Sequence, residues 1–298
     1  MTWLFEFDID ACMPELPEVQ TVVNDLIAAG LTGATIKRAR IYWRSTIAGL
    51  SAEDFLMGIK GCKISTIYRR AKYIVFDFDN KSHLLIHLRM TGRLHLSGPE
   101  NKIKKHEHVI FELNDGRHLR FHDTRKFGRI FLTKNPYSIF DRLGPEPLSH
   151  LFTARKLAAK LRAHKRMLKP LLLDQAFIAG LGNIYVDEAL WDAKVHPKTQ
   201  SDTFSDREIQ VLHRAIRKVL RRGLKNLGTT LGNGRTNFYS VAKRRGRNSD
   251  QLRVFRRDGS PCFRCKTEIE RILVGQRATH FCPICQPEQP CQSPDNSS

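Results

Sequence analysis

The spacing of apolar residues divides the chain into a leading helix, a β-rich first half and a helical second half. From Val19 to Ile27, apolar residues recur every three or four positions, which predicts a helix over residues 14–29 that ends at Gly30. The period then changes to two, and we expect strands at residues 35–48, 63–69, 72–78, 83–90, 106–113, 117–122 and 128–133. Many short strands after a single helix favour a β-sandwich or a flattened barrel.

The pattern becomes helical after residue 147. A sharp turn at Gly180 and Gly182 precedes a helix that starts at Asn183, and its free N–H groups could bind a phosphate. The same glycines could instead only ease the packing of a helical hairpin. The stretch 232–250 is basic and contains glycine, which predicts a mobile loop, and the Pro-, Gln- and Ser-rich tail from Gln286 predicts disorder. The remaining helices are expected at residues 153–165, at residues 168–178 and from Ser205, where Glu208 completes a capping box.

Four cysteines near the end of the chain predict a metal site. Cys262-x-x-Cys265 is followed after sixteen residues by Cys282-x-x-Cys285, the spacing of two knuckles that hold one structural Zn²⁺ between four thiolates. Such a site leaves no coordination position open for water. The interval has the length and the alternation of a short β-hairpin. The alternatives are four unrelated thiols or two disulfides.

The charge of the chain favours a polyanionic partner. The formal net charge is +20, from 50 Lys and Arg against 30 acids, and no acid occurs between Glu208 and Asp250. A basic stretch that leads into a zinc hairpin favours nucleic acid over a membrane surface. No apolar run is long enough to span a membrane, and the first twelve residues, with three acids and no base, do not form a targeting signal. Paired cysteines without a signal fit a reducing cytosol.

Six short motifs follow one another along the chain, and together they carry a resemblance. They are Met13-Pro14-Glu15-Leu16-Pro17-Glu18-Val19, Arg69-Arg70-Ala71-Lys72-Tyr73, His87-Leu88-Arg89-Met90-Thr91-Gly92, Asp123-Thr124-Arg125-Lys126-Phe127-Gly128, Gly180-Leu181-Gly182-Asn183-Ile184-Tyr185 and Gln276-Arg277-Ala278-Thr279. In this order they resemble the start, the catalytic-lysine loop, the two intercalation loops, the helix–two-turn–helix motif and the zinc-hairpin tip of formamidopyrimidine-DNA glycosylases. These bacterial enzymes excise oxidised purines from DNA.

The resemblance implies an α+β multidomain protein that is a monomer of the bacterial cytosol and nucleoid. Its partner would be double-stranded DNA that contains oxidised bases. Its activity would be bifunctional, combining a glycosylase that flips out 8-oxoguanine or formamidopyrimidines with a lyase that cleaves the abasic strand. The implied parts are an N-terminal extension (1–12), a catalytic β-sandwich (13–147), a helix–two-turn–helix domain with a basic loop (148–250), a zinc-finger hairpin (251–288) and a disordered tail (289–298).

The resemblance also implies roles for single residues. The Pro14 amine would form a Schiff base with the sugar, with Glu15 as proton donor. Lys72 would contact phosphate and base and donate a proton, and Arg277 would clamp a phosphate and act in the lyase step. The implied DNA contacts are His87, Met90, Arg125, Phe127, Lys169 and Asn183, and the implied ligands of one Zn²⁺ are Cys262, Cys265, Cys282 and Cys285.

The residues alone would favour plainer roles for several of these positions. Pro14 suits a helix entry, Lys72 a solvated strand end, and Glu15 or Glu18 a charge at a helix N-terminus, where Glu18 fits better. Met90 and Phe127 would be core residues. The resemblance implies that three side chains fill the gap left by a flipped base, those of Met90, Arg125 and Phe127. A thioether, a guanidinium and an aromatic ring are chemically suited to this role, but only the resemblance assigns it.

Two features depart from the pattern of the family. Residues 1–12 precede Met13, and as long as they remain, Pro14 is a tertiary amide that cannot attack; we therefore expect translation to start at Met13, or the extension to be trimmed. The loop 235–250 is strongly basic where the family caps its lesion. Two alternatives remain, an endonuclease VIII-like glycosylase of oxidised pyrimidines and, if residues 1–12 are retained, a non-catalytic zinc protein that binds damaged DNA.

Overall fold

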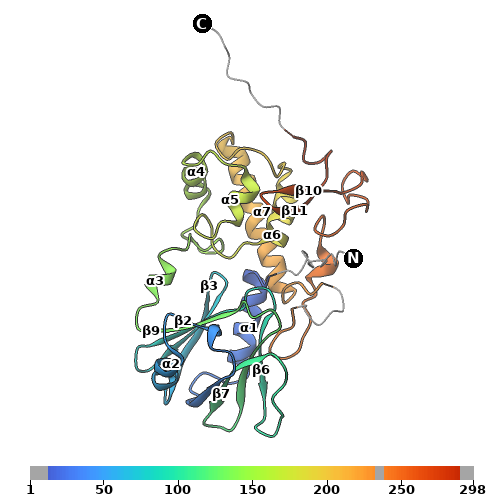
Figure 1. Cartoon of the computed structure of the whole chain (residues 1–298). Helices are drawn as coiled ribbons and strands as arrows, with labels where there is room; N and C mark the ends of the chain where they lie inside the picture. The colour runs from blue at the N-terminus through green and yellow to red at the C-terminus, as the bar shows by residue number, and fades with distance from the viewer. Residues whose placement is uncertain (1–12, 232–237, 289–298) are drawn as a thin grey trace, which may run out of the picture. The chain divides into compact units, whose positions relative to one another are not determined.

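The computed structural model describes residues 13–231 and 238–288. The predicted extension (1–12), the predicted tail (289–298) and part of the predicted mobile loop (232–237) lie outside the described residues. The described chain forms two compact units, one of residues 13–143, 221–231 and 238–250 and the other of residues 144–220 and 251–288 (Figure 1). The helical unit therefore ends earlier than the helical domain expected over 148–250, because the described residues 221–231 and 238–250 group with the first unit.

The first unit is a β-sandwich, as the alternating pattern predicts. One sheet has the order β2 (Ile47–Ala48), β9 (Arg129–Thr133), β5 (His83–His87), β4 (Tyr73–Phe78) and β3 (Ile64–Arg70). The other has the order β1 (Ile36–Ile41), β7 (Glu107–Leu113), β8 (His118–Asp123) and β6 (Gly92–Ser97). Neighbouring strands are antiparallel except β2 and β9, which are parallel.

Helix α1 (Leu16–Ala28) packs on β3 and β4 through the apolar face that the sequence predicts. Its Val19 and Leu26 are fully buried in one core with Phe76 and Phe111 from the two sheets. The unit also contains α2 (Ala52–Ile59), α3 (Tyr137–Phe140) and the short 3₁₀ helices η1 (Arg44–Thr46) and η2 (Asn248–Gln251), whose last residue begins the next segment of the second unit.

Two carboxylates of α1 bind the returning segment of the first unit. The Glu18 carboxylate accepts a hydrogen bond from the Thr229 backbone N–H at 2.6 Å. Asp25, which is 4 % exposed, accepts the Ala242 N–H at 3.0 Å and pairs with the Arg244 guanidinium. The Asp25 contacts attach residues 238–250 to α1, so this described part of the predicted mobile loop is held by hydrogen bonds and an ion pair.

The second unit is helical and carries a β-hairpin, as the sequence predicts. Its helices are α4 (Ala154–Arg162), α5 (Leu168–Leu173), α6 (Asn183–Ala193) and α7 (Asp206–Lys225), and α7 continues into the first unit. The predicted capping box of α7 is confirmed, because Glu208 accepts hydrogen bonds from the Ser205 N–H and hydroxyl at 2.8 and 2.6 Å. The hairpin pairs β10 (Glu270–Val274) with β11 (Arg277–Phe281).

The prediction of disorder from Gln286 onward is wrong for Gln286 itself. Gln286 is fully buried, its Oε1 accepts the Cys282 N–H at 3.0 Å, and its Nε2 donates to the Val195 carbonyl at 2.8 Å. Gln286 is therefore part of the second unit. In the part of the chain that the structure describes, no helix combines the length and the apolar character needed to cross a membrane.

Candidate functional site

The start of α1 places two adjacent candidate residues in a buried position. Pro14 is buried, and Glu15 at the N-cap is only 1 % exposed. The Glu15 N–H donates to the Glu18 carboxylate at 3.0 Å, and Glu18 also binds the Thr229 N–H. Both Glu18 oxygens therefore stabilise the fold, as the helix-terminus interpretation predicts, whereas Glu15 is the carboxylate directly beside Pro14.

Lys72 lies in the tight turn between β3 and β4. Arg70 pairs with Tyr73 across a two-residue turn whose first residue, Ala71, has a φ of 54°. The Lys72 side chain is only 6 % exposed, which excludes the interpretation as a solvated strand-end lysine. The hairpin thus holds an ammonium in a largely desolvated position.

His87 at the end of β5 is a neutral imidazole. It stands opposite Tyr73 in the ladder, with ring centroids 4.8 Å apart. Burial, together with the positive charges of Arg89 and Lys72, lowers the pKa of His87 to about 3. Its Nδ1 accepts the Arg89 N–H at 3.0 Å, so the ring proton is on Nε2 and points away from that turn.

The depressed pKa of His87 predicts a loss of stability in acid. An unfolded imidazole titrates near pH 6.5 and the folded one near pH 3, so between these values the unfolded state takes up the extra proton. Stability due to His87 is complete above about pH 6.5 and falls by about 3 kcal/mol by about pH 4. Urea unfolding of the wild type and of His87→Gln across this range measures the difference. Parallel pH profiles for the two proteins would contradict it.

The turns 88–92 and 123–128 are joined by one buried carboxylate. Asp123 at the end of β8 is fully buried, and its Oδ1 accepts the Thr91 hydroxyl and the Arg125 N–H, the latter at 3.2 Å. Its Oδ2 accepts the Gly128 N–H at 2.7 Å. Asp123 was not among the predicted site residues, although it opens one of the six motifs. It fixes the loop of Met90 against the loop of Arg125 and Phe127.

These turns present the three side chains that were expected to fill the gap. Phe127 is 46 % exposed, which excludes the core interpretation, and the Arg125 guanidinium lies 5.0 Å from its ring centroid. Met90 is half-buried. Gly128 leaves no room for a side chain, because a Cβ there would lie 2.4 Å from the ring of Phe121. The first unit thus offers a ring, a guanidinium and a thioether from two turns that are bonded to the same carboxylate.

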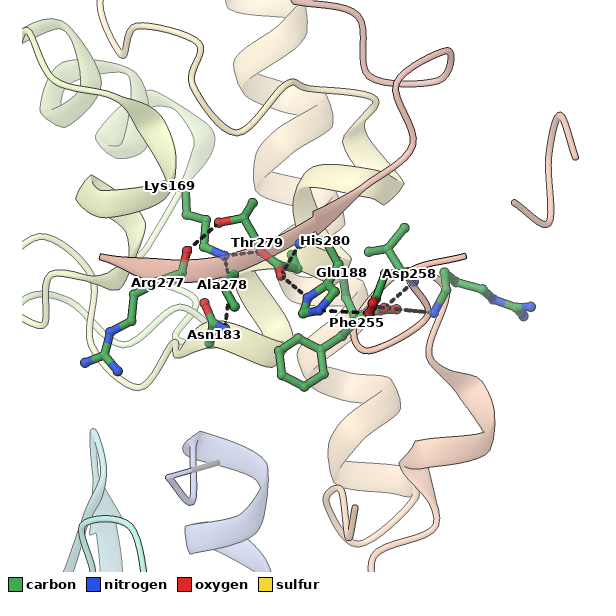
Figure 2. A network of polar contacts seen from close by, with 12 residues as sticks. Lys169, Asn183, Glu188, Phe255, Asp258, Arg277, Ala278, Thr279 and His280 are labelled. Carbon is green, nitrogen blue, oxygen red and sulfur yellow. Dashed lines mark hydrogen bonds and ion pairs between the residues drawn. The ribbon is translucent and has the colours of Figure 1, made fainter. Parts of the chain in front are cut away.

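In the second unit a buried polar network connects α5 and α6 to the hairpin (Figure 2). The Lys169 ammonium is fully buried, lies 2.5 Å from Asp187 and donates to the Ala278 carbonyl at 2.9 Å. The Asn183 amide donates to the same carbonyl at 2.9 Å. Two residues that were expected to contact DNA therefore hold the hairpin. Lys169 lies inside the unit and not on its surface, and the DNA contact of each remains a prediction.

Two adjacent acids of α6 bind other parts of the zinc-finger segment, residues 251–288. The second oxygen of Asp187 accepts the His280 N–H at 2.9 Å, and the His280 ring lies between Asp187 and Asp258. Glu188, 1 % exposed, accepts the backbone N–H groups of residues 253–255. Both acids were missed from the sequence. The available signal was a pair of acids inside the otherwise apolar run of α6.

The hairpin tip presents Arg277. Gly275 and Gln276 form a two-residue turn with φ values of 56° and 62°, and a Cβ on Gly275 would lie 2.8 Å from the Pro170 ring. Arg277 is exposed, and its side chain makes no hydrogen bond or ion pair with any residue that the structure describes. The turn therefore docks on α5 and projects one guanidinium.

The four cysteines have the geometry of a tetrahedral metal site. Their sulfur atoms all lie within 4.8 Å of one another, and three of the sulfur–sulfur distances are 3.4, 3.5 and 3.9 Å. Zn–S bonds of about 2.3 Å require sulfur–sulfur edges of about 3.8 Å, so the donor set fits Zn²⁺. All four cysteines are free thiols, which excludes disulfides within the quartet, and the three distances are well above the S–S bond length of about 2.05 Å. Backbone N–H groups of Arg264 and Cys285 point at two of the sulfurs at 3.4 Å.

The sulfurs differ in their acidity. Hydrogen bonds from the Thr267 side chain and backbone lower the pKa of Cys265 to about 6, and burial raises the pKa of Cys285 to about 12. A bound dication favours the thiolate form of every ligand. The packing around them is apolar and includes Trp191, Val254 and Ile269.

In a comparison with known proteins, three segments of the chain match family models. Residues 13–130 match the formamidopyrimidine-DNA glycosylase N-terminal domain, residues 143–233 its H2TH domain, and residues 259–287 the zinc finger found in FPG and IleRS.

Curated relatives include formamidopyrimidine-DNA glycosylases of Protochlamydia amoebophila and Herpetosiphon aurantiacus. They are 44 % and 42 % identical over 92 % of this chain and 99 % and 100 % of their own length. Solved relatives include a Lactococcus lactis FPG mutant bound to DNA containing Fapy-dG, with 34 % identity and a TM-score of 0.85. Another is MutM bound to DNA containing carbocyclic 8-oxo-G, with 33 % identity and a TM-score of 0.84. Both structures are covered completely and cover 92 % of this chain.

Proposed function

Since this chain belongs to the formamidopyrimidine-DNA glycosylase family and is a glycosylase of oxidised purines, we propose that it is bifunctional and also cleaves the abasic strand. Its substrate is duplex DNA that carries 8-oxoguanine or formamidopyrimidines, the lesions of the similar complexes. The observation that carries the proposal is Pro14 directly before the buried carboxylate Glu15 at the start of α1.

The proposed reaction begins with the free amine of Pro14. Its lone pair attacks C1′ of the flipped nucleotide, the bond to the damaged base breaks, and the base leaves with the proton that the Pro14 nitrogen gives up. Glu15 supplies a proton to the sugar ring oxygen as the ring opens, which gives an iminium ion between Pro14 and C1′. The iminium acidifies the C2′ hydrogen, so the 3′ phosphate and then the 5′ phosphate leave by elimination, and water releases the sugar fragment.

This mechanism requires an N-terminal Pro14. An α-amino group titrates near pH 8, so part of it is neutral at physiological pH, whereas an acylated proline nitrogen has no available lone pair. The family match begins at Met13, and the relatives align over nearly their full length with 92 % of this chain. We therefore propose that the active form begins at Pro14.

Lys72 and His87 are proposed to bind the phosphate next to the lesion. Lys72 holds a largely buried ammonium, and the neutral His87 carries a donor at Nε2. Met90, Arg125 and Phe127 are proposed to fill the gap in the stack, with Arg125 bonded to the orphan base. The shared anchor at Asp123 supports this assignment because it fixes both turns on one unit.

Cys262, Cys265, Cys282 and Cys285 are proposed to hold one Zn²⁺ as a scaffold. A four-thiolate site supplies structural cross-linking and leaves no position for a reacting water. The chain's own residues complete the module: Asn183 and Lys169 hold the Ala278 carbonyl, and Arg277 beside it clamps a DNA phosphate and serves the lyase step.

Arg277→Ala is expected to weaken binding to lesion-free duplex and to reduce its salt dependence. Loss of one phosphate contact lowers the slope of log K against log salt concentration by about 0.9. Fluorescence anisotropy at several salt concentrations measures the slope. The control is Arg271→Ala, which removes an exposed arginine from β10 of the same hairpin. An unchanged slope in Arg277→Ala would contradict the phosphate clamp.

Competing excision assays test the choice of substrate. With the chain that begins at Pro14, 8-oxoguanine paired with cytosine should be removed faster than thymine glycol paired with adenine, by at least about tenfold in kcat/KM. Faster removal of the glycol would favour the endonuclease VIII-like alternative. Tight binding of both lesions with no excision would favour the non-catalytic alternative.

A further inference from the structure

A hollow of about 800 Å³ lies on the first unit, between elements that the proposed reaction does not use. Its walls are β2 with the residues after it, α2, the turn between β4 and β5, β9 and α3 (labelled in part in Figure 1). The volume is within the range of pockets for small ligands, about 300–1,000 Å³. Its apolar lining includes Leu50, Phe131, Leu132 and Ile139.

The apolar surface is accessible, and the neutral polar groups beside it are already bonded. Leu50 remains 41 % exposed. The Ser82 hydroxyl donates to Asn80 at 2.6 Å, and the Ser138 hydroxyl donates to the Asn135 carbonyl at 2.9 Å. The hollow is therefore a place where an apolar body loses contact with water without leaving these hydroxyl donors unpaired.

The charged groups of the hollow favour an anion. Two exposed cations line the hollow: Lys134, which follows β9, and Arg142, which follows α3. Neither side chain makes a hydrogen bond or ion pair within the described ranges 13–231 and 238–288. The one acid in the lining, Asp54, accepts a hydrogen bond at 2.7 Å from the hydroxyl of Ser51, the residue that caps α2. Two available cations against one engaged carboxylate give the rim a positive balance.

We propose that this hollow binds a small amphipathic anion, with an aromatic or aliphatic body on Leu50, Phe131 and Ile139 and one carboxylate or sulfonate between Lys134 and Arg142. Burial of the body drives binding, and the two cations select for the charge. None of the residues that line the hollow belongs to the proposed catalytic, DNA-binding or zinc-binding set. The site is therefore separate from the proposed reaction and does not depend on it.

Anilinonaphthalene sulfonate is a probe of the required chemistry, and N-phenylnaphthylamine is its uncharged counterpart. Fluorescence titration of the full chain should give a dissociation constant on the order of 10–100 μM for the sulfonate and at least about fivefold weaker binding for the neutral compound. Dodecanoate should displace the sulfonate. Equal affinity for the charged and the neutral probe would overturn the proposal.

Variants locate the probe in the hollow. Ser138→Trp places a large ring in it and should weaken binding by at least about tenfold. The surface double variant Lys134→Gln with Arg142→Gln leaves the core intact and should weaken binding of the sulfonate, but not of the neutral probe, by about fivefold or more. The control, Lys105→Gln, removes an exposed lysine of the same unit that does not line the hollow. Wild-type affinity in the double variant, or a loss of equal size in the control, would overturn the proposal.

Discussion

A chain that begins at Pro14 is expected to be trapped covalently on lesion-containing duplex by borohydride, whereas the full chain of 298 residues is expected to give no trapped product. The reason is chemical: only the free secondary amine can form the iminium that borohydride reduces. Because the nucleophile is absent from the acylated form, the single-turnover rate of excision should differ by at least about 10³-fold. Denaturing electrophoresis of the trapped complex and quenched-flow assays of base release measure the two quantities.

A chain that begins at Met13 is the matched control for this experiment. It differs from the active form by one residue, yet its Pro14 nitrogen is an amide, so it should behave like the full chain. Equal binding of all three forms to uncleaved duplex would show that the difference lies in the chemistry. Excision by the full chain at the rate of the Pro14 form, with its N-terminus intact by mass spectrometry, would refute the proposed mechanism.

Cys282→Ser is expected to abolish zinc binding and to lower the affinity for lesion DNA by at least about 100-fold, while the first unit stays folded. One thiolate lost from a closed four-sulfur site removes much of a metal-binding free energy of about 10–16 kcal/mol in small zinc modules. Atomic absorption gives the zinc content, and anisotropy gives the affinity. Amide hydrogen exchange follows the two units separately, and protection of Phe76 and Phe111 should be unchanged.

Cys62→Ser is the matched control, because Cys62 is a buried cysteine of the first unit outside the quartet. It should keep one equivalent of zinc and full affinity for DNA. Retention of zinc by Cys282→Ser would contradict the four-thiolate site. Loss of protection throughout both units would show that the module does not fold separately from the sandwich.

Local patterns were enough to predict most of the secondary structure. Alternation predicted the strands that became β3, β4, β5, β7, β8 and β9, because each has one face in the core. Helix α2 was missed, since it is short, contains Gly58 and depends on a cap from Ser51 that a local pattern shows only weakly. The parallel pair of β2 and β9 was not predictable, because its partners are more than eighty residues apart along the chain.

In the candidate site, too, the local features were predictable and the long-range contacts were not. The cysteine spacing predicted a quartet whose sulfurs the structure brings together, since each knuckle is local. Asp123, Asp187 and Glu188 were missed because each has partners far away in the sequence. Asp123 binds Thr91, Asp187 binds Lys169 and His280, and Glu188 binds residues 253–255. The sequence shows these acids, but it does not show which distant groups each of them binds.

The single carboxylate of Asp123 has a consequence for engineering and for divergence. Since Asp123 accepts hydrogen bonds from the turn of Thr91 and from the turn that contains Arg125 and Gly128, neither turn can be exchanged without affecting the other. Transplanting one turn from a homologue should be tolerated only when the other turn comes with it, and paired exchanges should show strong epistasis. Across homologues, the sequences of the two turns are expected to change together.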